Sequence, residues 1–168
     1  MNHVEQPFSK ASYSLEGFEL RFLRFEEASL IAEHLVAMEP WSTLQYSKNS
    51  LVHHFQNDDP SLKRFTVLIE NQVAGIICVR HPWLLGPYLE TLGLFKIFQG
   101  VGHGRRILNW LKNEAFLNSK NLWTLVSSFN EAARSFYADF GFEQVAILPG
   151  LVHSDLDEVL LRIQREEL

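Results

Sequence analysis

Cysteine is almost missing from this sequence: Cys78 is the only one among 168 residues. A single cysteine cannot form an internal disulfide, so the composition argues against a disulfide-stabilised secreted domain and indicates a reducing compartment. Cys78 lies in the apolar run Ala74–Val79, and we therefore expect it to be a buried strand residue.

Long apolar runs are also absent. No stretch approaches the ~20 residues that a transmembrane helix needs. The N-terminal residues 1–14 are polar and lack the apolar segment of a secretion signal. We therefore expect a soluble, cytoplasmic protein in which residues 1–14 form a loose N-terminal tail.

The sequence has no cluster of positive charge. Its 15 Lys and Arg residues are scattered, and 20 Asp and Glu residues bring the formal net charge to −5 at pH 7. We expect no nucleic-acid partner, because phosphate backbones are normally met by a basic stripe. A mildly acidic surface suits a cationic substrate such as an amine, although charge of this size discriminates weakly.

Metal-ligand spacing is missing too. His53 and His54 are adjacent, so they point to different faces of the helix predicted there and cannot share a metal ion as an i, i+4 pair can. The remaining candidate ligands fall in two separate loops: His81, His153, Asp155 and Asp157. We predict no metal site.

The apolar content, 46% of the chain, is enough for the core of one domain. Alternating and helical periodicities give the element order β-α-α-β-β-β-α-β-α-β-β, which predicts an α/β fold with a mixed sheet and helices on its faces. The expected strands cover residues 18–25, 65–70, 73–80, 88–95, 122–129, 142–148 and 158–163. The expected helices cover residues 26–38, 47–57, 104–118 and 130–141, and a hairpin turn is expected at Asn71-Gln72.

Three glycines at alternate positions, Gly100, Gly102 and Gly104, lie between a predicted strand and a predicted helix. The start of a helix has backbone N–H groups without intrahelical partners and carries partial positive charge, so this turn suits an anion such as a phosphate. Two nucleotide-binding motifs do not fit. The dinucleotide fingerprint needs glycine where Arg105 stands, and the P-loop needs Gly-Lys-Ser/Thr, which is absent.

Another pattern does fit. The segment Gln99–Gly104 (Q-G-V-G-H-G) resembles the acetyl-CoA signature Gln/Arg-x-x-Gly-x-Gly/Ala of the GNAT superfamily of N-acetyltransferases. The segments Asn130–Tyr137 (N-E-A-A-R-S-F-Y) and Phe140–Phe142 (F-G-F) resemble the second CoA-side motif of that family, and Glu90 stands where many members carry an acidic residue. The similarity covers residues 18–163 in element order and residues 88–142 in specific motifs.

The resemblance implies a single N-acetyltransferase domain over residues 1–168, with a twisted, mostly antiparallel sheet of six to seven strands and helices on both faces. It implies acetyl-CoA as co-substrate, with its pyrophosphate on the glycine turn and its pantetheine arm along a strand that a bulge near Gly93 parts from its neighbour. Asn130 is first of all a helix cap, and the signature leaves the position of His103 free. The implied cofactor-binding residues are Leu92, Leu94, Gln99, Gly100, Val101, Gly102, His103, Gly104, Arg105, Asn130, Ala133 and Tyr137.

The same resemblance assigns catalysis to two side chains. Tyr137 stands where the family places a tyrosine, as general acid towards the CoA sulfur, and its phenolic proton is available across the physiological pH range. Without the motif, Tyr137 would be one more aromatic residue on the core face of its helix. Glu90 is the candidate base, because a carboxylate in an apolar strand is costly unless it is hydrogen-bonded or functional. An outward-facing strand glutamate is an equal alternative.

The sequence does not name the acceptor. Trp41 and Tyr46 lie in a turn-like segment and either border an acceptor site or cover one end of the core. We therefore predict a monomeric or homodimeric enzyme that moves an acetyl group from acetyl-CoA to a primary amine. Two alternatives stay open: a CoA-binding regulator without turnover, and a transferase for protein N-termini or lysines, which needs an open groove between residues 38–57 and 149–157.

Overall fold

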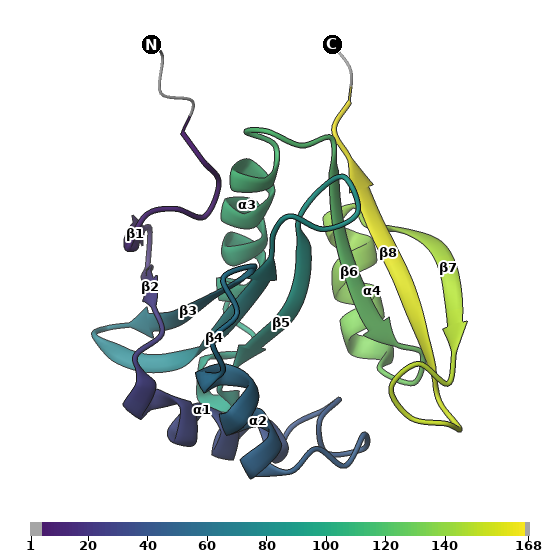
Figure 1. Ribbon diagram of the computed structural model, residues 1–168, viewed down its shortest axis with the longest axis horizontal. Helices are drawn as coiled ribbons and strands as arrows, with labels where there is room; N and C mark the ends of the chain where they lie inside the picture. The colour runs from purple at the N-terminus through teal and green to yellow at the C-terminus, as the bar shows by residue number, and fades with distance from the viewer. Residues whose placement is uncertain (1–4, 167–168) are drawn as a thin grey trace.

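A computed structural model describes residues 5–166 of the chain, which fold around one eight-stranded sheet (Figure 1). The strands are β1 (Ser12–Leu15), β2 (Phe18–Phe22), β3 (Leu62–Ile69), β4 (Gln72–Arg80), β5 (Tyr88–Leu94), β6 (Asn121–Ser127), β7 (Glu143–Pro149) and β8 (Asp157–Gln164). Their order in the sheet is β1-β2-β3-β4-β5-β6-β8-β7, and every junction is antiparallel except β5–β6. The predicted α/β fold with a mostly antiparallel mixed sheet is confirmed, with one strand more than the six to seven expected.

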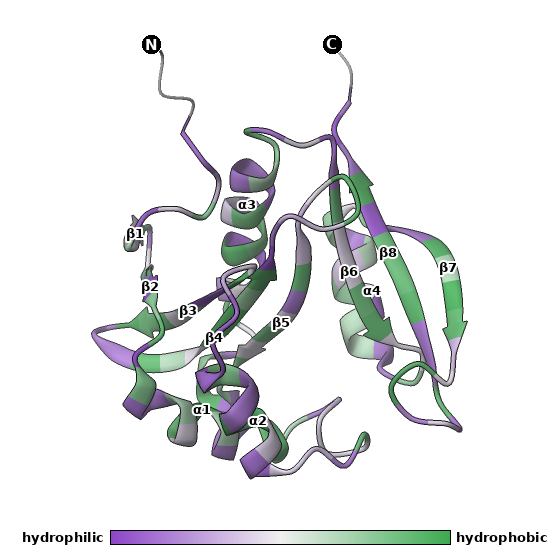
Figure 2. Cartoon of the chain, in the orientation of Figure 1, coloured by the Kyte–Doolittle hydropathy of each residue, from purple (hydrophilic) through white to green (hydrophobic). Residues whose placement is uncertain are grey.

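Four α-helices cover the two faces of this sheet. They are α1 (Ala28–Val36), α2 (Lys48–Gln56), α3 (His103–Ala115) and α4 (Glu131–Phe140), and two short 3-10 helices, η1 (Phe25–Glu27) and η2 (Lys96–Phe98), precede α1 and α3. Alternation along β4 separates two cores, because Ile77 and Val79 pack with α3 whereas Ile76 and Cys78 pack with α1 and α2. Cys78 is fully buried, as predicted. Figure 2 shows β8 as hydrophobic over most of its length, with hydrophilic interruptions.

The N-terminal segment differs from the loose tail that the sequence predicted. Ser12–Leu15 form β1, which pairs with β2, and Phe8 is fully buried. Glu114 of α3 accepts hydrogen bonds from the backbone N–H of Phe8 at 2.8 Å and from the hydroxyl of Tyr13 at 3.1 Å. The prediction was wrong for this part because the stabilising contacts come from a helix about a hundred residues away; residues 1–4 lie outside the described residues.

The residues that the sequence predicted to begin or end helices do so in the structure. Ser47 caps α2 by accepting a hydrogen bond from the Ser50 N–H at 3.0 Å, and Asn130 caps α4 by accepting one from the Ala133 N–H at 3.1 Å. Gly141 ends α4 in the left-handed region at φ 113°. The β3–β4 turn lies one residue earlier than expected, at Glu70 and Asn71, both of which have positive φ. Among residues 5–166 no helix is long and apolar enough to span a bilayer.

Candidate active site

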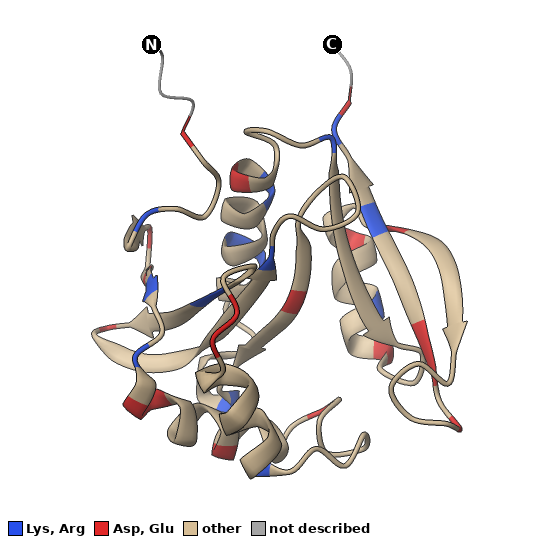
Figure 3. Cartoon of the chain, viewed as in Figure 1, with Lys and Arg blue, Asp and Glu red and all other residues tan. Residues whose placement is uncertain are grey.

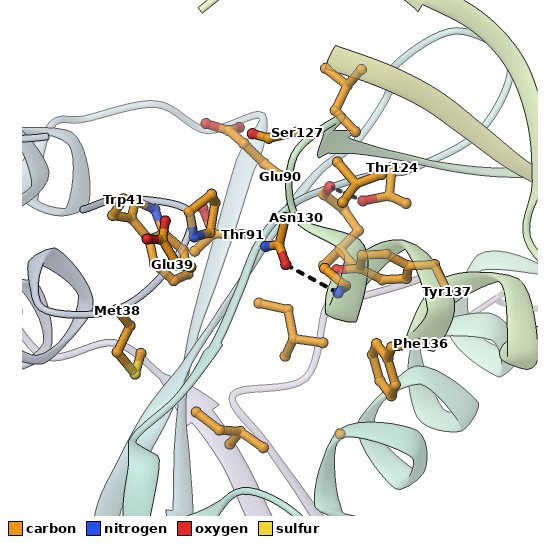
Figure 4. Close-up of a pocket in the computed structure, with 18 of the residues that line it drawn as sticks. Met38, Glu39, Trp41, Glu90, Thr91, Thr124, Ser127, Asn130, Phe136 and Tyr137 are labelled. Carbon is orange, nitrogen blue, oxygen red and sulfur yellow. Dashed lines mark hydrogen bonds between the residues drawn. The ribbon is translucent and has the colours of Figure 1, made fainter. Parts of the chain in front are cut away.

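The parallel strands β5 and β6 diverge soon after they meet. Their described pairs are Tyr88 with Trp123 and Leu89 with Thr124, and beyond these the ribbons separate (Figure 1). A cavity of about 1200 Å³ opens there, lined by both strands, the glycine turn, α4 and the segment between α1 and α2 (Figure 4). The separated strands expose backbone edges to this cavity, which suits a ligand that pairs with a strand.

The bulge that turns β5 lies at Glu90. Opposite β4, Thr91 pairs with Cys78 and Leu89 with Val79, so Glu90 is the extra residue. The predicted bulge near Gly93 was wrong, since Gly93 pairs in register with Ile76. Glycine is needed there for packing, because a Cβ on Gly93 would lie 2.4 Å from Cδ2 of Leu35 in α1.

The glycine turn opens onto one end of the cavity. Gly100 and Gly102 have φ values of 80° and 91°, which side-chain-bearing residues rarely adopt, and no atom lies within 4 Å of where their Cβ atoms would stand. Gly104 is needed for close packing, because its Cβ would lie 3.1 Å from Cζ of Phe136 in α4. Gln99 fixes the entry to the turn by donating from Nε2 to the Leu94 carbonyl at 2.8 Å.

This geometry fits a pyrophosphate at the start of α3. The first N–H groups of α3 lack intrahelical partners, and the open space around the two left-handed glycines lets an anion approach the backbone. Arg105 lines the same end of the cavity and stacks its guanidinium over the Phe140 ring at 5.6 Å. Of the predicted site residues, Val101 and His103 do not line the cavity. The others do: Glu90, Leu92, Leu94, Gln99, Gly100, Gly102, Gly104, Arg105, Asn130, Ala133 and Tyr137.

Tyr137 lies on α4 at the wall of the cavity that faces β6 (Figure 4). Its side chain is part of the α3-side core and contacts the rings of Phe136 and Phe142, so both descriptions that the sequence offered, core aromatic and site residue, apply to it. Burial raises the pKa of Tyr137 to about 12, and a hydrogen bond with the Thr124 side chain offsets part of that rise. The phenol therefore keeps its proton throughout the physiological pH range.

Glu90 points into the cavity, which rules out the outward-facing alternative. Its Oε2 accepts hydrogen bonds from Nε and Nη2 of Arg80 at 3.2 and 3.0 Å, and its Oε1 lies 2.8 Å from Nε2 of His54 in α2. Burial alone would raise the pKa of Glu90, but His54 and Arg80 outweigh it and hold the pKa below its ordinary value. His54, which the sequence singled out only as an unsuitable metal ligand, is thus a partner of a residue in the cavity.

Both the sequence and the fold of this chain match known acetyltransferases. A model of the acetyltransferase (GNAT) family matches residues 22–142. The chain belongs to this family. Its fold is also that of solved acetyltransferases: one from Thermus thermophilus superposes with a TM-score of 0.71 at 18% identity over 88% of this chain and 97% of that one. A chimeric spermidine N-acetyltransferase from Vibrio cholerae gives 0.69 at 19% identity over 88% and 95%. No curated protein matches the sequence.

Membership of the GNAT family makes this protein an acetyltransferase and implies acetyl-CoA as co-substrate, with an amine as acceptor. The glycine turn and the diverging strands described above are features that fit the pyrophosphate and the extended arm of CoA. No group of three or more His, Cys, Asp or Glu side chains is arranged to hold a metal ion in residues 5–166, and a metal-free site stays a prediction.

One carboxylate of this GNAT site, Glu158 of β8, was not predicted. It is 4% exposed, lines the cavity and pairs across the sheet with Ser127 of β6, whose hydroxyl donates to its Oε1 at 2.8 Å. Burial raises the pKa of Glu158, and the Ser127 hydrogen bond lowers it only in part. The signal was in the sequence: the argument that singled out Glu90, a carboxylate in an apolar strand, applies equally to Glu158.

The acceptor side of the cavity is largely apolar and aromatic. The segment between α1 and α2 contributes Trp41 and Tyr46, so the prediction that they border an acceptor site is consistent with their positions; Trp41 also packs on the α1–α2 core. Their neighbours on this side are Met38, Pro40, Leu44, Leu51, Trp83, Tyr88, Leu151 and Val152. Figure 3 shows acidic residues on β5 and β8, the strands that carry Glu90 and Glu158.

Proposed function

We propose that this protein transfers an acetyl group from acetyl-CoA to a primary amine by direct attack of the amine on the thioester. The single observation that supports it best is that the glycine turn, the parted edges of β5 and β6, and the Tyr137 phenol all border one cavity. The thioester supplies an activated acyl group. The protein supplies position, a proton for the departing sulfur and a place for the proton that the amine loses.

Tyr137 is the proposed general acid. When the carbon–sulfur bond breaks, its phenolic oxygen gives a proton to the thiolate and later regains one from solvent. The raised pKa of about 12 keeps the donor protonated before the reaction and means that the phenolate readily regains a proton afterwards. Asn130 and Ala133 would contact the cofactor at the start of α4, close to Tyr137.

The reaction also needs a base that accepts the proton lost by the amine. Glu90 keeps the base role that the sequence predicted as a hypothesis, but its hydrogen bonds to Arg80 and His54 occupy both oxygens. A carboxylate held below its ordinary pKa is a weak proton acceptor. These partners fit Glu90 better as a residue that shapes the bulge and the cavity.

A small-molecule acceptor fits the cavity better than a protein acceptor. The segment between α1 and α2 and the β7–β8 loop both contribute to its lining, through Tyr46 and through Leu151 and Val152. Both segments therefore border the space where the acceptor would lie, and a cavity of about 1200 Å³ has room for a small amine beside the cofactor. Spermidine is the substrate named for three of the similar structures, but a likeness of 18–19% identity carries the fold and leaves the acceptor to be found by experiment.

The test is a panel of primary amines incubated with acetyl-CoA and followed by thiol release, run on the wild type and on Tyr137→Phe. We expect turnover with at least one amine, a kcat lower by about 100-fold in Tyr137→Phe, and unchanged CoA affinity. Tight CoA binding without turnover of any amine would favour the regulator. Equal kcat values in the two proteins would remove Tyr137 from the mechanism.

A further inference from the structure

The cavity contains two buried or half-buried carboxylates with opposite surroundings. The carboxylate of Glu90 contacts the side chains of Arg80 and His54, so its charge is compensated within the protein. Glu158 accepts one hydrogen bond from a neutral hydroxyl, and the described residues form no ion pair with it. Keeping a carboxylate buried without a cation costs free energy, so its retention points to a cation that arrives from outside.

On the basis of the proposed function, we infer that Glu158 binds the ammonium group of the acceptor and takes the proton that this group must lose. Ser127 holds Oε1, while Oε2 has no hydrogen-bond partner among residues 5–166 and is left for the substrate. One N–H bond breaks, its electron pair stays on nitrogen as the nucleophile, and the proton moves to Oε2. After the reaction the proton leaves Glu158 for solvent.

The surroundings of Glu158 favour this role. Ser127 faces it from β6, Leu148 lies opposite it on β7, and Tyr46 and Tyr88 interact with it electrostatically from the α1–α2 segment and from β5. None of these neighbours carries a positive charge near neutral pH. Burial therefore acts almost unopposed and raises the pKa of Glu158, which makes the carboxylate a stronger base than Glu90.

The walls around this anion define the class of acceptor. Trp41, Tyr46, Trp83 and Tyr88 give the acceptor side an aromatic surface, and Arg80 already compensates Glu90. The remaining acid on this side is Glu39, which is exposed and accepts a hydrogen bond from the Thr43 hydroxyl. An ion pair between an exposed carboxylate and an ammonium group contributes little affinity. One uncompensated buried anion among aromatic rings suits a monoamine with an aromatic or apolar body rather than a polyamine.

The binding test uses the full chain saturated with CoA and titrated calorimetrically with 2-phenylethylamine, 1,4-diaminobutane and the uncharged 2-phenylethanol. We expect 2-phenylethylamine to bind at least about ten-fold more tightly than either other compound, and Glu158→Gln to lose that preference. Glu39→Gln is the matched control, since it removes an exposed carboxylate charge from the same cavity and should keep the preference. Equal binding of the amine by wild type and Glu158→Gln, or tighter binding of the diamine, would overturn the inference.

Turnover separates this inference from the proposed function. With the best amine of the panel, Glu158→Gln should lower kcat/KM by about 100-fold at unchanged CoA affinity, and Glu158→Asp should restore part of it. Full activity in Glu158→Gln would remove Glu158 from the reaction while leaving acetyl transfer in place. If the wild type turned over no amine, the proposed function would fail, whereas the calorimetric preference would still decide whether Glu158 binds ammonium.

A second variant covers the case in which Glu158→Gln fails to fold. Ser127 is a positioning residue, and Ser127→Ala removes the one hydrogen bond that lowers the pKa of Glu158. The acidic limb of the kcat/KM profile should then move to higher pH, and Ser127→Thr should return it. A profile that stays in place in Ser127→Ala would show that the titrating base is another group, and would overturn the assignment.

Discussion

Arg80 donates from both Nε and Nη2 to the same oxygen of Glu90, at 3.2 and 3.0 Å. The remaining guanidinium nitrogen, Nη1, bonds Asp59 Oδ2 at 2.7 Å and Ser61 Oγ at 2.8 Å. Arg80 therefore ties the bulge of β5 to the segment that precedes β3. Because Glu90 is the extra residue in that bulge, this ion-pair network fixes the shape of the cavity wall where the strands begin to part.

The first prediction concerns this network. Arg80→Gln should lower the free energy of unfolding by about 1–3 kcal/mol, because it leaves Glu90 and Asp59 without their shared cation. Urea unfolding near neutral pH measures the loss. The double variant Arg80→Gln/Glu90→Gln should lose less than the sum of the single losses, and strict additivity would show that the two side chains are not coupled.

The second prediction separates strain from binding at the glycine turn. Gly102→Ala and Gly141→Ala place alanine at φ 91° and φ 113°, with no atom within 4 Å of either added Cβ, so each should cost about 1 kcal/mol of stability. Only Gly102 lines the cavity. Calorimetric titration should therefore find weaker CoA binding in Gly102→Ala and normal binding in Gly141→Ala. A similar loss in both would mean that the turn has no specific part in CoA binding.

The third prediction tests why residue 93 is glycine. Gly93→Ala would bring a Cβ within 2.4 Å of Leu35 Cδ2 and 3.2 Å of the Trp41 ring, and such overpacking should cost about 1–3 kcal/mol in urea unfolding. In a Leu35→Ala background the Cβ has room, so the additional cost of Gly93→Ala should shrink. An unchanged cost there would place its origin in the backbone.

The fourth prediction is a pH dependence of stability. Burial alone would raise the pKa of Glu27, but hydrogen bonds from Arg21, Thr66 and the Arg24 backbone lower it to about 2, below its ordinary 4.5. A lowered folded-state pKa gives stability that is present above about pH 4.5 and is lost as the pH falls towards 2. Glu27→Gln should remove that part of the acid dependence. The exposed neighbour variant Glu26→Gln should not, and identical acid curves for Glu27→Gln and wild type would contradict the assignment.

Features that depend on a few neighbouring residues could be predicted from the sequence. The caps at Ser47, Asn130 and Gly141 bond within three or four residues, and the left-handed turn at Gly100 and Gly102 needs only backbone freedom. The signature of the family is also local in the sequence, so it can be recognised without the structure. The mostly antiparallel mixed sheet, the cradle at the start of α3 and the membership of the GNAT family therefore followed from the chain alone.

Features that depend on pairing between distant segments needed the tertiary structure. The register between β4 and β5 puts the bulge at Glu90, and contact with Glu114 orders Phe8 and Tyr13. Glu158 meets Ser127 across 31 positions of sequence. Whether a carboxylate is compensated by Arg80 or left without a cation is a property of such long-range contacts. The sequence thus indicated the cofactor that the family uses, and only the folded sheet decided which acid in the cavity is left without a compensating cation, because burial and charge compensation arise when separate strands are brought together.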